Sequence, residues 1–292
     1  MKKLTIAILN FNSGEYLSKC LDSIKNVKDE ADITVVAIDN DSSDDSFIKA
    51  KEQFKDVKFI QNPENVGFSK GYNQTLKEAK GEYILLLNPD CLLEKGVIKK
   101  TIQDLDDVLN NKKVGAVTCK IILSNGKIDL TAHRGFPTPW ASLLYALGDD
   151  SLYHLKDKLT DEIHEVDSIT GAFFMTKKSI LEEVGYLDER FFLYGEDIDL
   201  SMRIKNKGYK IIYDPTVKIT HYKGISSGLK KHSQELTAAN SKTKLKAMNS
   251  FYEAMILFYD KHYKKKYPII VTWLVYLGVY LKWGIAKLKT TV

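Results

Sequence analysis

Apolar runs alternate with amphipathic segments along the first 120 residues of the chain. The apolar runs predict strands at 4–9, 33–38, 57–60, 82–87 and 114–122. The segments between them predict helices at 15–25, 44–54, 69–79 and 95–109. Strands that are apolar throughout and are separated by helices are typical of a parallel sheet with both faces covered. We therefore expect an α/β fold with a mostly parallel sheet flanked by helices.

The pattern becomes irregular between residues 126 and 165, where turn residues mix with aromatic ones in HRGFPTPWASLLYALGDD. We interpret this segment as an excursion that closes over a site. Regular structure returns as a strand and a helix within 166–185 and as a helix at 196–207. Two strands follow at 209–213 and 217–222, joined through Asp214-Pro215, and from residue 232 the pattern predicts mostly helix.

Composition changes this picture little. The hydrophobic content of 44% and the charged content of 28% are typical of soluble globular proteins. Cys20, Cys91 and Cys119 are widely spaced and form no CxxC pair, which argues against a structural zinc site or a disulfide framework. A reducing cytoplasm fits this usage. The apolar run near the N-terminus lacks a small-residue cleavage site, so we expect a first strand and not a signal peptide.

Charge is unevenly distributed. Seven lysines and no acidic residue follow from Lys261 onward, whereas the rest of the chain is nearly neutral. This balance argues against a nucleic-acid binder and for a tail that contacts an anionic surface. The apolar run 268–281 would span about 21 Å as a helix, which is shorter than the hydrocarbon core of about 30 Å. Its flanking lysines, with Trp273 and Trp283, favour a helix lying at a membrane interface. The alternative is a helix that packs on the body or on a second subunit.

Polar loops follow four of the predicted strands. They are NFNS after the first, DNDSSD after the second, NPENVGF after the third and NPD after the fourth. Any one of them could simply build a turn or cap a helix, as Ser43 or Asp44 would do. The carboxyl ends of parallel strands lie at one edge of a sheet, where α/β folds bind ligands. Four polar loops at that edge therefore indicate a site for a polar ligand.

Acidic residues and one histidine supply candidate chemistry. Asp90 ends a strand and could bind Mg2+ or Mn2+ together with a diphosphate, although it could also be a turn residue. Glu196 and Asp199 share a helix face, so Asp197 points elsewhere and is available as a general base. Carboxylates in a first turn also suit the helix dipole by themselves. His221 precedes a loop, 224–228, that could fold over phosphate, and its alternative is a structural role.

Seven motifs in order resemble a known family. They are ILNFN, IDNDSSDDS, NPENVGFSKGYN, LLLNPD, ITGAFFM, DERFFLYGEDIDLSMR and THYKGISSG, and they span residues 4–228. Together they resemble family 2 glycosyltransferases, in particular the bacterial rhamnosyltransferase-like branch. The resemblance implies a GT-A fold with a Rossmann-like sheet at 1–230, divided into a nucleotide-binding half at 1–120 and an acceptor half at 121–230. A C-terminal helical region at 231–292, associated with the membrane, would follow.

The resemblance also implies roles for individual residues. Nucleotide contacts would come from Asn10, Asn12, Asp39, Asn40, Asn65, Gly67, Phe68, Asn73 and Asn88. A metal would be bound by Asp90 and His221. The family's metal motif has two aspartates around one residue, whereas Asn88 stands first here. Asp197 matches the catalytic base, and the acceptor would be bound by Gly171, Ala172, Glu196 and Asp199.

The function implied is an inverting, metal-dependent transfer that uses Mn2+ or Mg2+. The favoured donor is dTDP-L-rhamnose, and the acceptor is a lipid-linked saccharide or a polysaccharide of the cell surface. Alternatives are a UDP-hexose or UDP-N-acetylhexosamine donor, and a non-catalytic relative that holds nucleotide or lipid. A sugar nucleotidyltransferase is disfavoured because the loop NFNSGEYLSK has one glycine and no arginine. We expect a cytoplasmic protein, peripheral on the inner face of the cell membrane, with homo-oligomerisation left open.

Overall fold

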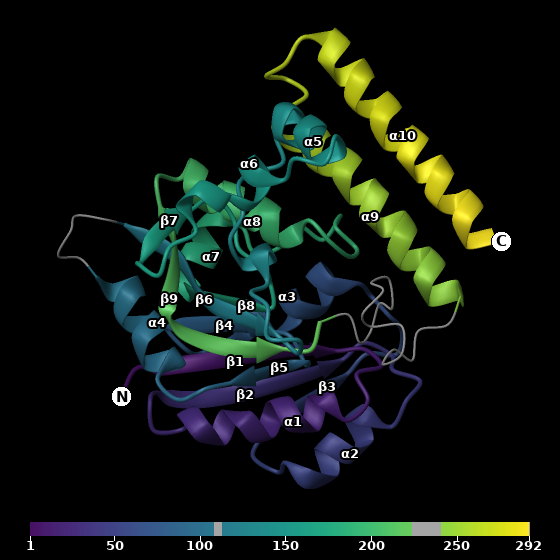
Figure 1. The fold of residues 1–292 in the computed structure, drawn as a ribbon. Coiled ribbons are helices and arrows are strands. Elements are labelled where there is room, and N and C mark those ends of the chain that lie inside the picture. Colours follow the sequence, from purple (N-terminus) through teal and green to yellow (C-terminus); the bar gives the residue numbers. More distant parts are fainter. Residues whose placement is uncertain (108–112, 224–240, 292) are drawn as a thin grey trace.

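Parallel strands form the N-terminal half of the sheet (Figure 1). This computed structural model describes residues 1–107, 113–223 and 241–291. The strands β1 (Lys3–Asn10), β2 (Asp32–Asp39), β3 (Lys58–Gln61) and β4 (Tyr83–Leu87) pair in the order β3-β2-β1-β4. The helices α1 (Tyr16–Ser23), α2 (Ser46–Gln53) and α3 (Phe68–Glu78) connect them. All five residues of β4 are buried, as expected for a strand covered on both faces. The predicted parallel core is confirmed.

The second half of the sheet is mixed. The strand β8 (Phe173–Lys177) runs antiparallel to β4, and β6 (Val114–Leu123) follows it in the sheet. Beyond β6 lie β9 (Lys210–His221) and β5 (Cys91–Leu93), and β7 (His164–Val166) pairs with the other end of β9. The helices α4 (Val97–Asp106), α7 (Lys178–Val184) and α8 (Glu196–Asn206) accompany these strands. Within the described residues this gives one sheet of nine strands.

Two details differ from the prediction. The two strands expected on either side of Pro215 are one strand, β9, because a register shift accommodates the proline. Cys119 pairs with Asp214, whereas Lys120 pairs with Lys218, so the residues around Pro215 bulge out of the ladder. The short strand β5 was not predicted, since three residues carry no periodic pattern. The helix α2 begins at Ser46. The backbone N–H of Ser46 donates a hydrogen bond to Asp44 Oδ1 at 3.2 Å.

The irregular segment 126–165 folds into short pieces above the sheet (Figure 1). They are the 3-10 turns Leu130–Ala132 and Lys156–Lys158 with α5 (Pro139–Ala146) and α6 (Ser151–His154) between them. Arg134, within this segment, forms an antiparallel bridge with Ser168, which lies between β7 and β8. The bridge therefore ties the excursion to the residues that precede β8.

The C-terminal region consists of two long helices. The helix α9 (Ser241–His262) packs on α8 through a second apolar cluster that includes Phe191, Ile198 and Phe258. Residues 232–240, also expected to be helical, lie outside the described residues. The helix α10 (Ile269–Thr291) folds back along α9, and Tyr259 and Thr272 share a 3.0 Å hydrogen bond between them. The C-terminal extension is thus continuous with the packing of the body.

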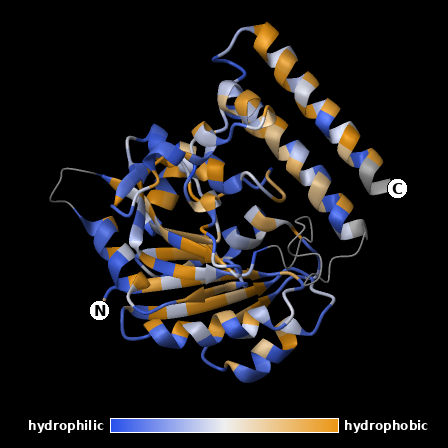
Figure 2. Ribbon diagram, in the orientation of Figure 1, coloured by the Kyte–Doolittle hydropathy of each residue, from blue (hydrophilic) through white to orange (hydrophobic). Residues whose placement is uncertain are grey.

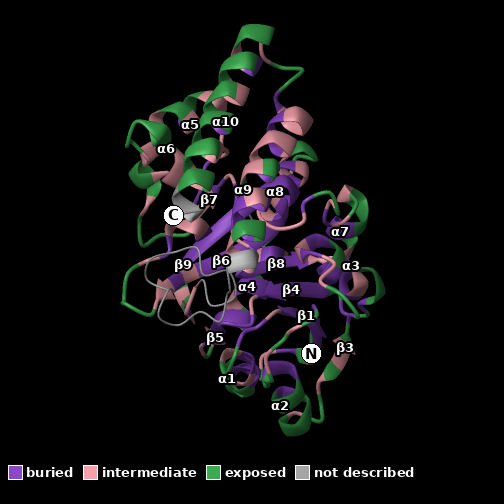
Figure 3. Ribbon diagram, turned by 90° about the vertical axis from the view of Figure 1, so that its right-hand side faces the viewer, coloured by how far each residue is buried: buried purple, intermediate pink, exposed green. Residues whose placement is uncertain are grey.

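One face of α10 remains exposed and apolar (Figures 2 and 3). Trp273 is 67% exposed and Leu277 is 56% exposed, and the stripe continues through Leu274, Leu281, Ile285 and Leu288. Trp283 behaves differently, because it stacks on Tyr252 and donates a hydrogen bond to Asn249. Within the described residues, Ile269–Leu288 is long and apolar enough to cross a membrane by length and composition. This span extends past the run of fourteen apolar residues read from the sequence, across Lys282 and Lys287.

Candidate active site

The turn between β4 and β5 brings Asp90 beside His221. Cys91 opens β5 directly after Asp90, and it pairs in register with His221 at the end of β9. This pairing places His221 Nε2 3.1 Å from Asp90 Oδ1. Both residues are buried, with 6% of Asp90 and 4% of His221 exposed. Two residues that are far apart in the sequence therefore meet through a strand pairing.

A second carboxylate supports His221 from the other side. Asp129 Oδ2 lies 3.5 Å from His221 Nδ1, and Lys223 Nζ contacts both oxygens of Asp129 at 2.6 Å. Burial opposes a charged imidazole, but Asp90 and Asp129 outweigh it and raise the pKa of His221 to about 9. Burial also works against the Asp129 carboxylate, but His221 and Lys223 hold its pKa well below the usual range. Sequence reasoning missed Asp129, which lies in the irregular segment without a motif.

The residues Asp90, Cys91 and His221 each offer one ligand atom, and these atoms lie within 4.8 Å of one another. Among the described residues, Asp90 Oδ1 and His221 Nδ1 are buried and make no hydrogen bond of good geometry in spite of their charged neighbours. The Asp90 carboxylate therefore fits Mn2+ or Mg2+, which take oxygen ligands and share them with phosphate. The His221 imidazole would join it as a ligand only after losing its proton, because histidine binds metals as the neutral ring. Burial raises the pKa of the Cys91 thiol well above its usual value, so the thiol stays protonated and is a poor ligand.

Residues 171 and 172 link this site to Asp197. The backbone carbonyl of Ala172 accepts hydrogen bonds from Asn88 N–H at 3.2 Å and from the Cys91 thiol at 3.4 Å. The backbone N–H of Gly171 donates to Asp197 Oδ2 at 3.3 Å. The structure thus brings the Asp90 loop, residues 171–172 and the start of α8 together.

The three carboxylates at the start of α8 lie in different surroundings. Asp197 is partly exposed, and Arg134 Nη2 lies 2.8 Å from its Oδ2 atom. Glu196 is buried, its Oε2 atom has no hydrogen-bond partner among the described residues, and burial followed by the Asp197 charge raises its pKa to about 8. Asp199 is fully buried under α9, where it contacts basic side chains. These contacts come from Arg203 at 2.8 Å, His262 at 2.7 Å and Lys261 at 2.6 Å.

Side chains at the first two strand ends mostly bind one another. Asn10 donates to Asp39 Oδ1 at 2.8 Å, and Asn12 accepts the backbone N–H of Ser43 at 2.7 Å. Asn40 donates to Asn65 Oδ1 at 3.0 Å. The structure brings these residues together, and their hydrogen bonds brace the loops. Their contact with a nucleotide stays a prediction.

Two further predicted nucleotide residues, Gly67 and Asn73, have close contacts within the protein. Gly67 has φ +87°, and a Cβ there would lie 2.7 Å from Phe192 Cδ2, so the close approach that requires glycine comes from Phe192. Asn73 is buried and donates to Leu187 O at 2.9 Å while its own oxygen accepts Leu187 N–H at 3.1 Å. Asn73 therefore ties α3 to the loop before α8.

Phe68 lies where the two halves meet. Its backbone N–H donates to Phe192 O at 2.6 Å, and its ring lies beside Gly171, where a Cβ would be 3.3 Å from Phe68 Cζ. The predicted nucleotide residue Phe68 and the predicted acceptor residue Gly171 are thus neighbours. The predicted phosphate loop, 224–228, lies outside the described residues.

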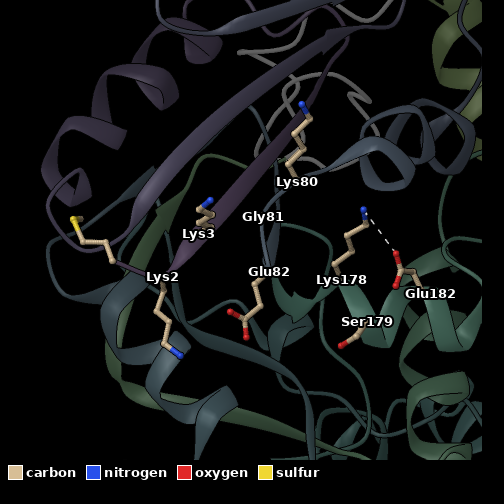
Figure 4. A pocket seen from close by; sticks show the side chains of 9 residues that line it. Lys2, Lys3, Lys80, Gly81, Glu82, Lys178, Ser179 and Glu182 are labelled. Atoms are coloured by element: carbon tan, nitrogen blue, oxygen red, sulfur yellow. Dashed lines mark ion pairs between the residues drawn. The ribbon is translucent and has the colours of Figure 1, made fainter.

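A surface hollow of about 540 Å³ lies at the opposite edge of the sheet (Figure 4). Lys2, Glu82 and Lys178 line it, at the start of β1, just before β4 and at the start of α7. Ligands of α/β sheets bind beyond the carboxyl ends of the strands. The hollow is therefore unrelated to the chemistry proposed for Asp90 and Asp197.

Comparisons with known proteins identify the family and the fold of the chain. The family described as "Glycosyltransferase like family 2" matches residues 2–240. An N-acetylglucosaminyl-diphospho-decaprenol L-rhamnosyltransferase of Mycobacterium tuberculosis is 24% identical over 77% of this chain and 78% of its own. A low-salt glycan biosynthesis hexosyltransferase of Haloferax volcanii is 27% identical over 71% of this chain and 63% of its own.

Among solved structures, a mannosyltransferase from Pyrobaculum calidifontis in complex with GDP-Man and Mn2+ is similar. It has a TM-score of 0.57 at 17% identity, and the match covers 96% of this chain and 69% of the other. This likeness shows the fold, which is GT-A with a C-terminal helical extension.

Proposed function

The chain belongs to glycosyltransferase family 2, and we propose that it transfers a sugar from a nucleotide diphosphate to an acceptor hydroxyl with inversion. The observation that carries the proposal is the arrangement around residues 171–172. The loop that carries Asp90 bonds to Ala172 O through Asn88 and Cys91, and Asp197 accepts the N–H of Gly171. A leaving diphosphate and an attacking hydroxyl need two such groups on opposite sides of one reacting carbon.

Asp197 is the carboxylate of its cluster best suited to act as general base. Asp199 is fully buried and already bound by Arg203, Lys261 and His262. The pKa of Glu196 is raised to about 8, so Glu196 is mostly protonated at neutral pH and is a poor proton acceptor there. Asp197 is partly exposed and next to Gly171. It would take the proton of the acceptor hydroxyl as that oxygen attacks the anomeric carbon.

Asp90 and His221 would hold a divalent cation. Such a cation supplies charge neutralisation for the departing nucleotide diphosphate when it is bound. Asp129 and Lys223 keep the His221 ring in place from the opposite side, as outer partners of metal-binding histidines commonly do. Asn88, which stands first in the metal motif, contributes its backbone to the loop that presents Asp90.

We infer inversion from the number of carboxylates available as a base or as a nucleophile. One displacement needs one base, whereas a retaining double displacement needs a dedicated nucleophile. In the part of the chain that the structure describes, the carboxylates around Gly171 have the roles given above, and we assign none of them to a covalent intermediate. We therefore propose a single displacement.

The proposed donor is dTDP-L-rhamnose, supported by the motif pattern and by the mycobacterial rhamnosyltransferase relative. A UDP-hexose or UDP-N-acetylhexosamine donor is the second candidate, which the hexosyltransferase relative favours. The name of the mycobacterial relative describes a lipid-linked saccharide, which supports the same class of acceptor here. We propose that the protein works at the inner face of the cell membrane, where the exposed stripe of α10 would contact lipid.

The proposed base is tested by Asp197→Asn. The variant should bind the nucleotide-sugar donor with near wild-type affinity, because the oxygen of the introduced amide would still accept a hydrogen bond from Arg134. Turnover should fall by about 100- to 10,000-fold, the range that general-base catalysis supplies. Donor affinity is measured by calorimetry, turnover by release of nucleotide diphosphate, and the anomeric configuration of the product by NMR.

Turnover within about threefold of the wild type would remove Asp197 from the mechanism. The same amide substitution at Glu196 and at Asp199 would then identify the base. A retained anomeric configuration would contradict the single displacement even if Asp197 proved essential. A protein that binds donor but turns over no acceptor would favour the non-catalytic alternative.

A further inference from the structure

Arg134 reaches Asp197 from the irregular segment 126–165. Its Nη2 atom lies 2.8 Å from Asp197 Oδ2 and 2.9 Å from the backbone oxygen of Ile169. The side chain of Arg134 is 8% exposed and that of Asp197 is 12% exposed. Arg134 lies in the stretch HRGFPTPW, which supplies neither the proposed base nor the proposed cation ligands.

The backbone of Arg134 is fixed independently of this contact. Its N–H donates to Ser168 O at 3.3 Å, and its carbonyl accepts the N–H groups of Asp167 and Ser168 at 3.1 and 2.9 Å. The guanidinium is then held at its far end by Ile169 O. Since both ends of Arg134 are fixed, its position dictates where Oδ2 of Asp197 lies. An arginine held in this way orients a carboxylate better than a flexible lysine would.

The contacts of Asp197 leave little freedom for its two oxygens. An ionised carboxylate offers about four acceptor positions. Oδ2 accepts from Arg134 and from Gly171 N–H, and Oδ1 accepts from Ile198 N–H at 2.8 Å. Three positions are therefore occupied, and the remaining one is on Oδ1. An acceptor hydroxyl would deliver its proton there.

We propose that Arg134 is a positioning residue that engages Oδ2 of Asp197 and so directs Oδ1 to the acceptor hydroxyl. This inference rests on the proposed function, because it concerns the base of that reaction. Arg134 acts through Asp197 and touches no reacting atom. The segment 126–165 thereby supplies, through Arg134, the side-chain contact that orients Asp197.

The alternative is a buried ion pair that only stabilises the fold. Loss of either partner would then lower stability, and any loss of activity would follow the amount of folded protein. A positioning role predicts something different, namely a lower kcat with unchanged donor KM in protein that remains folded. It also predicts that the effect depends on Asp197 being present.

A double-mutant cycle separates the two. Arg134→Lys and Arg134→Met are made in the wild type and in Asp197→Asn, and kcat, donor KM and melting temperature are measured for each. In the wild-type background Arg134→Met should lower kcat by about 100-fold, the usual cost of misplacing a catalytic group by about 1 Å. Arg134→Lys should lower it less, since the lysine keeps the charge but loses the second contact to Ile169.

In the Asp197→Asn background Arg134→Met should change the residual turnover by less than about threefold, because the group that it positions is already gone. An equal loss in both backgrounds, or a change mainly in donor KM, would overturn the proposal. If Arg134→Met does not fold, Arg134→Lys decides by the same comparison. An active Asp197→Asn enzyme would instead defeat the proposed base, and a fully active Arg134→Met enzyme with an inactive Asp197→Asn enzyme would defeat the positioning role alone.

Discussion

At the scale of single residues, the start of α8 shows how one helical turn gives three carboxylates three different environments. Glu196 is buried without a partner for Oε2 among the described residues, Asp197 faces Arg134, and Asp199 lies under α9. All three are favoured by the positive end of the helix dipole, so their presence in a first turn does not distinguish them. Their neighbours in space distinguish them.

Glu196 makes the stability of the protein depend on pH. Its folded-state pKa of about 8 lies above the ordinary value of 4.5, so the folded state binds the proton more tightly than the unfolded chain does. The resulting stability is fully present below about pH 4.5 and is lost as the pH rises through 8. Glu196→Gln carries no titrating group, and we expect its melting temperature relative to the wild type to rise between pH 5 and pH 9.

Differential scanning calorimetry of both proteins across this range is the measurement. Asp161→Asn is the matched control, because Asp161 is an exposed carboxylate whose side chain is 94% accessible. A constant difference between Glu196→Gln and the wild type from pH 5 to pH 9 would show that Glu196 is charged in the folded protein. The raised pKa assigned to Glu196 would then be wrong, and Glu196 would be a candidate for the general base.

At the scale of elements, α9 and α10 differ in what they contact: α9 packs on α8, whereas α10 packs on α9. The C-terminal end of α9 binds the base-bearing helix through Lys261 and His262, which both contact Asp199. Phe258 and Tyr259 add apolar packing against α8. The helix α10 touches α9 along one side and exposes the other. Removal of α10 alone therefore leaves the contacts of α8 intact.

Deletion from Lys264 onward should release the protein from anionic vesicles while transfer to a small soluble acceptor continues. The deletion removes the exposed stripe of α10 with the lysines on both sides of it, and leaves Lys261 and His262 in place. Binding of the full-length protein should weaken as salt rises, because lysine attraction to anionic lipid is screened. It should not vanish, since apolar insertion is insensitive to salt. Vesicle sedimentation at several ionic strengths measures both contributions.

Three matched substitutions in α10 separate lipid contact from packing. Trp273→Asn and Leu277→Asn change exposed positions of α10 and should weaken vesicle binding without a change in melting temperature. Val279→Asn changes a buried position and should lower the melting temperature instead. A full-length protein that ignores anionic vesicles at low salt would contradict the membrane contact and favour a subunit interface.

At the scale of the whole molecule, the sheet gathers residues from the whole length of the chain at one edge. Asp90 lies in the turn between β4 and β5, His221 ends β9, and Gly171 precedes β8, which pairs with β4. A donor bound at this edge would contact the strand ends of the N-terminal half and the cation site together. Its binding should therefore stabilise the molecule as a unit.

A panel of nucleotide sugars tests this by thermal shift. A ligand at a hundred times its Kd that binds only the folded state adds about 2.7 kcal/mol of stability. We expect dTDP-L-rhamnose to raise the melting temperature more than UDP-glucose or UDP-N-acetylglucosamine does, and Mn2+ to enlarge the shift. Asp90→Ala should remove the Mn2+ increment, because Asp90 is the carboxylate that the turn between β4 and β5 places beside His221.

Asp90→Asn serves as the control for shape, since it keeps the size of the side chain. An Mn2+ increment that survives in both variants would make Asp90 a turn residue, and the cation would bind elsewhere. A larger shift with a UDP sugar would overturn the rhamnose donor while leaving the family unaffected. These two outcomes are independent, so the panel tests the metal site and the donor separately.

The sequence by itself determined the features that depend on neighbours along the chain. Apolar runs placed β1 to β4 because a strand covered on both faces must be apolar throughout. Polar residues at the strand ends identified the ligand edge, and the spacing of Glu196 and Asp199 separated both from Asp197. These inferences need only local periodicity and the rule that parallel strands end at one edge.

Only the tertiary structure decided which distant residues meet. The three-residue strand β5 carries no pattern of its own, yet its pairing with β9 brings His221 to Asp90. Asp129 and Arg134 lie in an irregular segment, and nothing local indicates that one supports His221 and the other holds Asp197. Asn73 and Asp199 are polar residues within motifs whose partners, Leu187 and His262, follow from helix packing. Long-range pairing is set by the burial of the whole core, and a local pattern does not encode it.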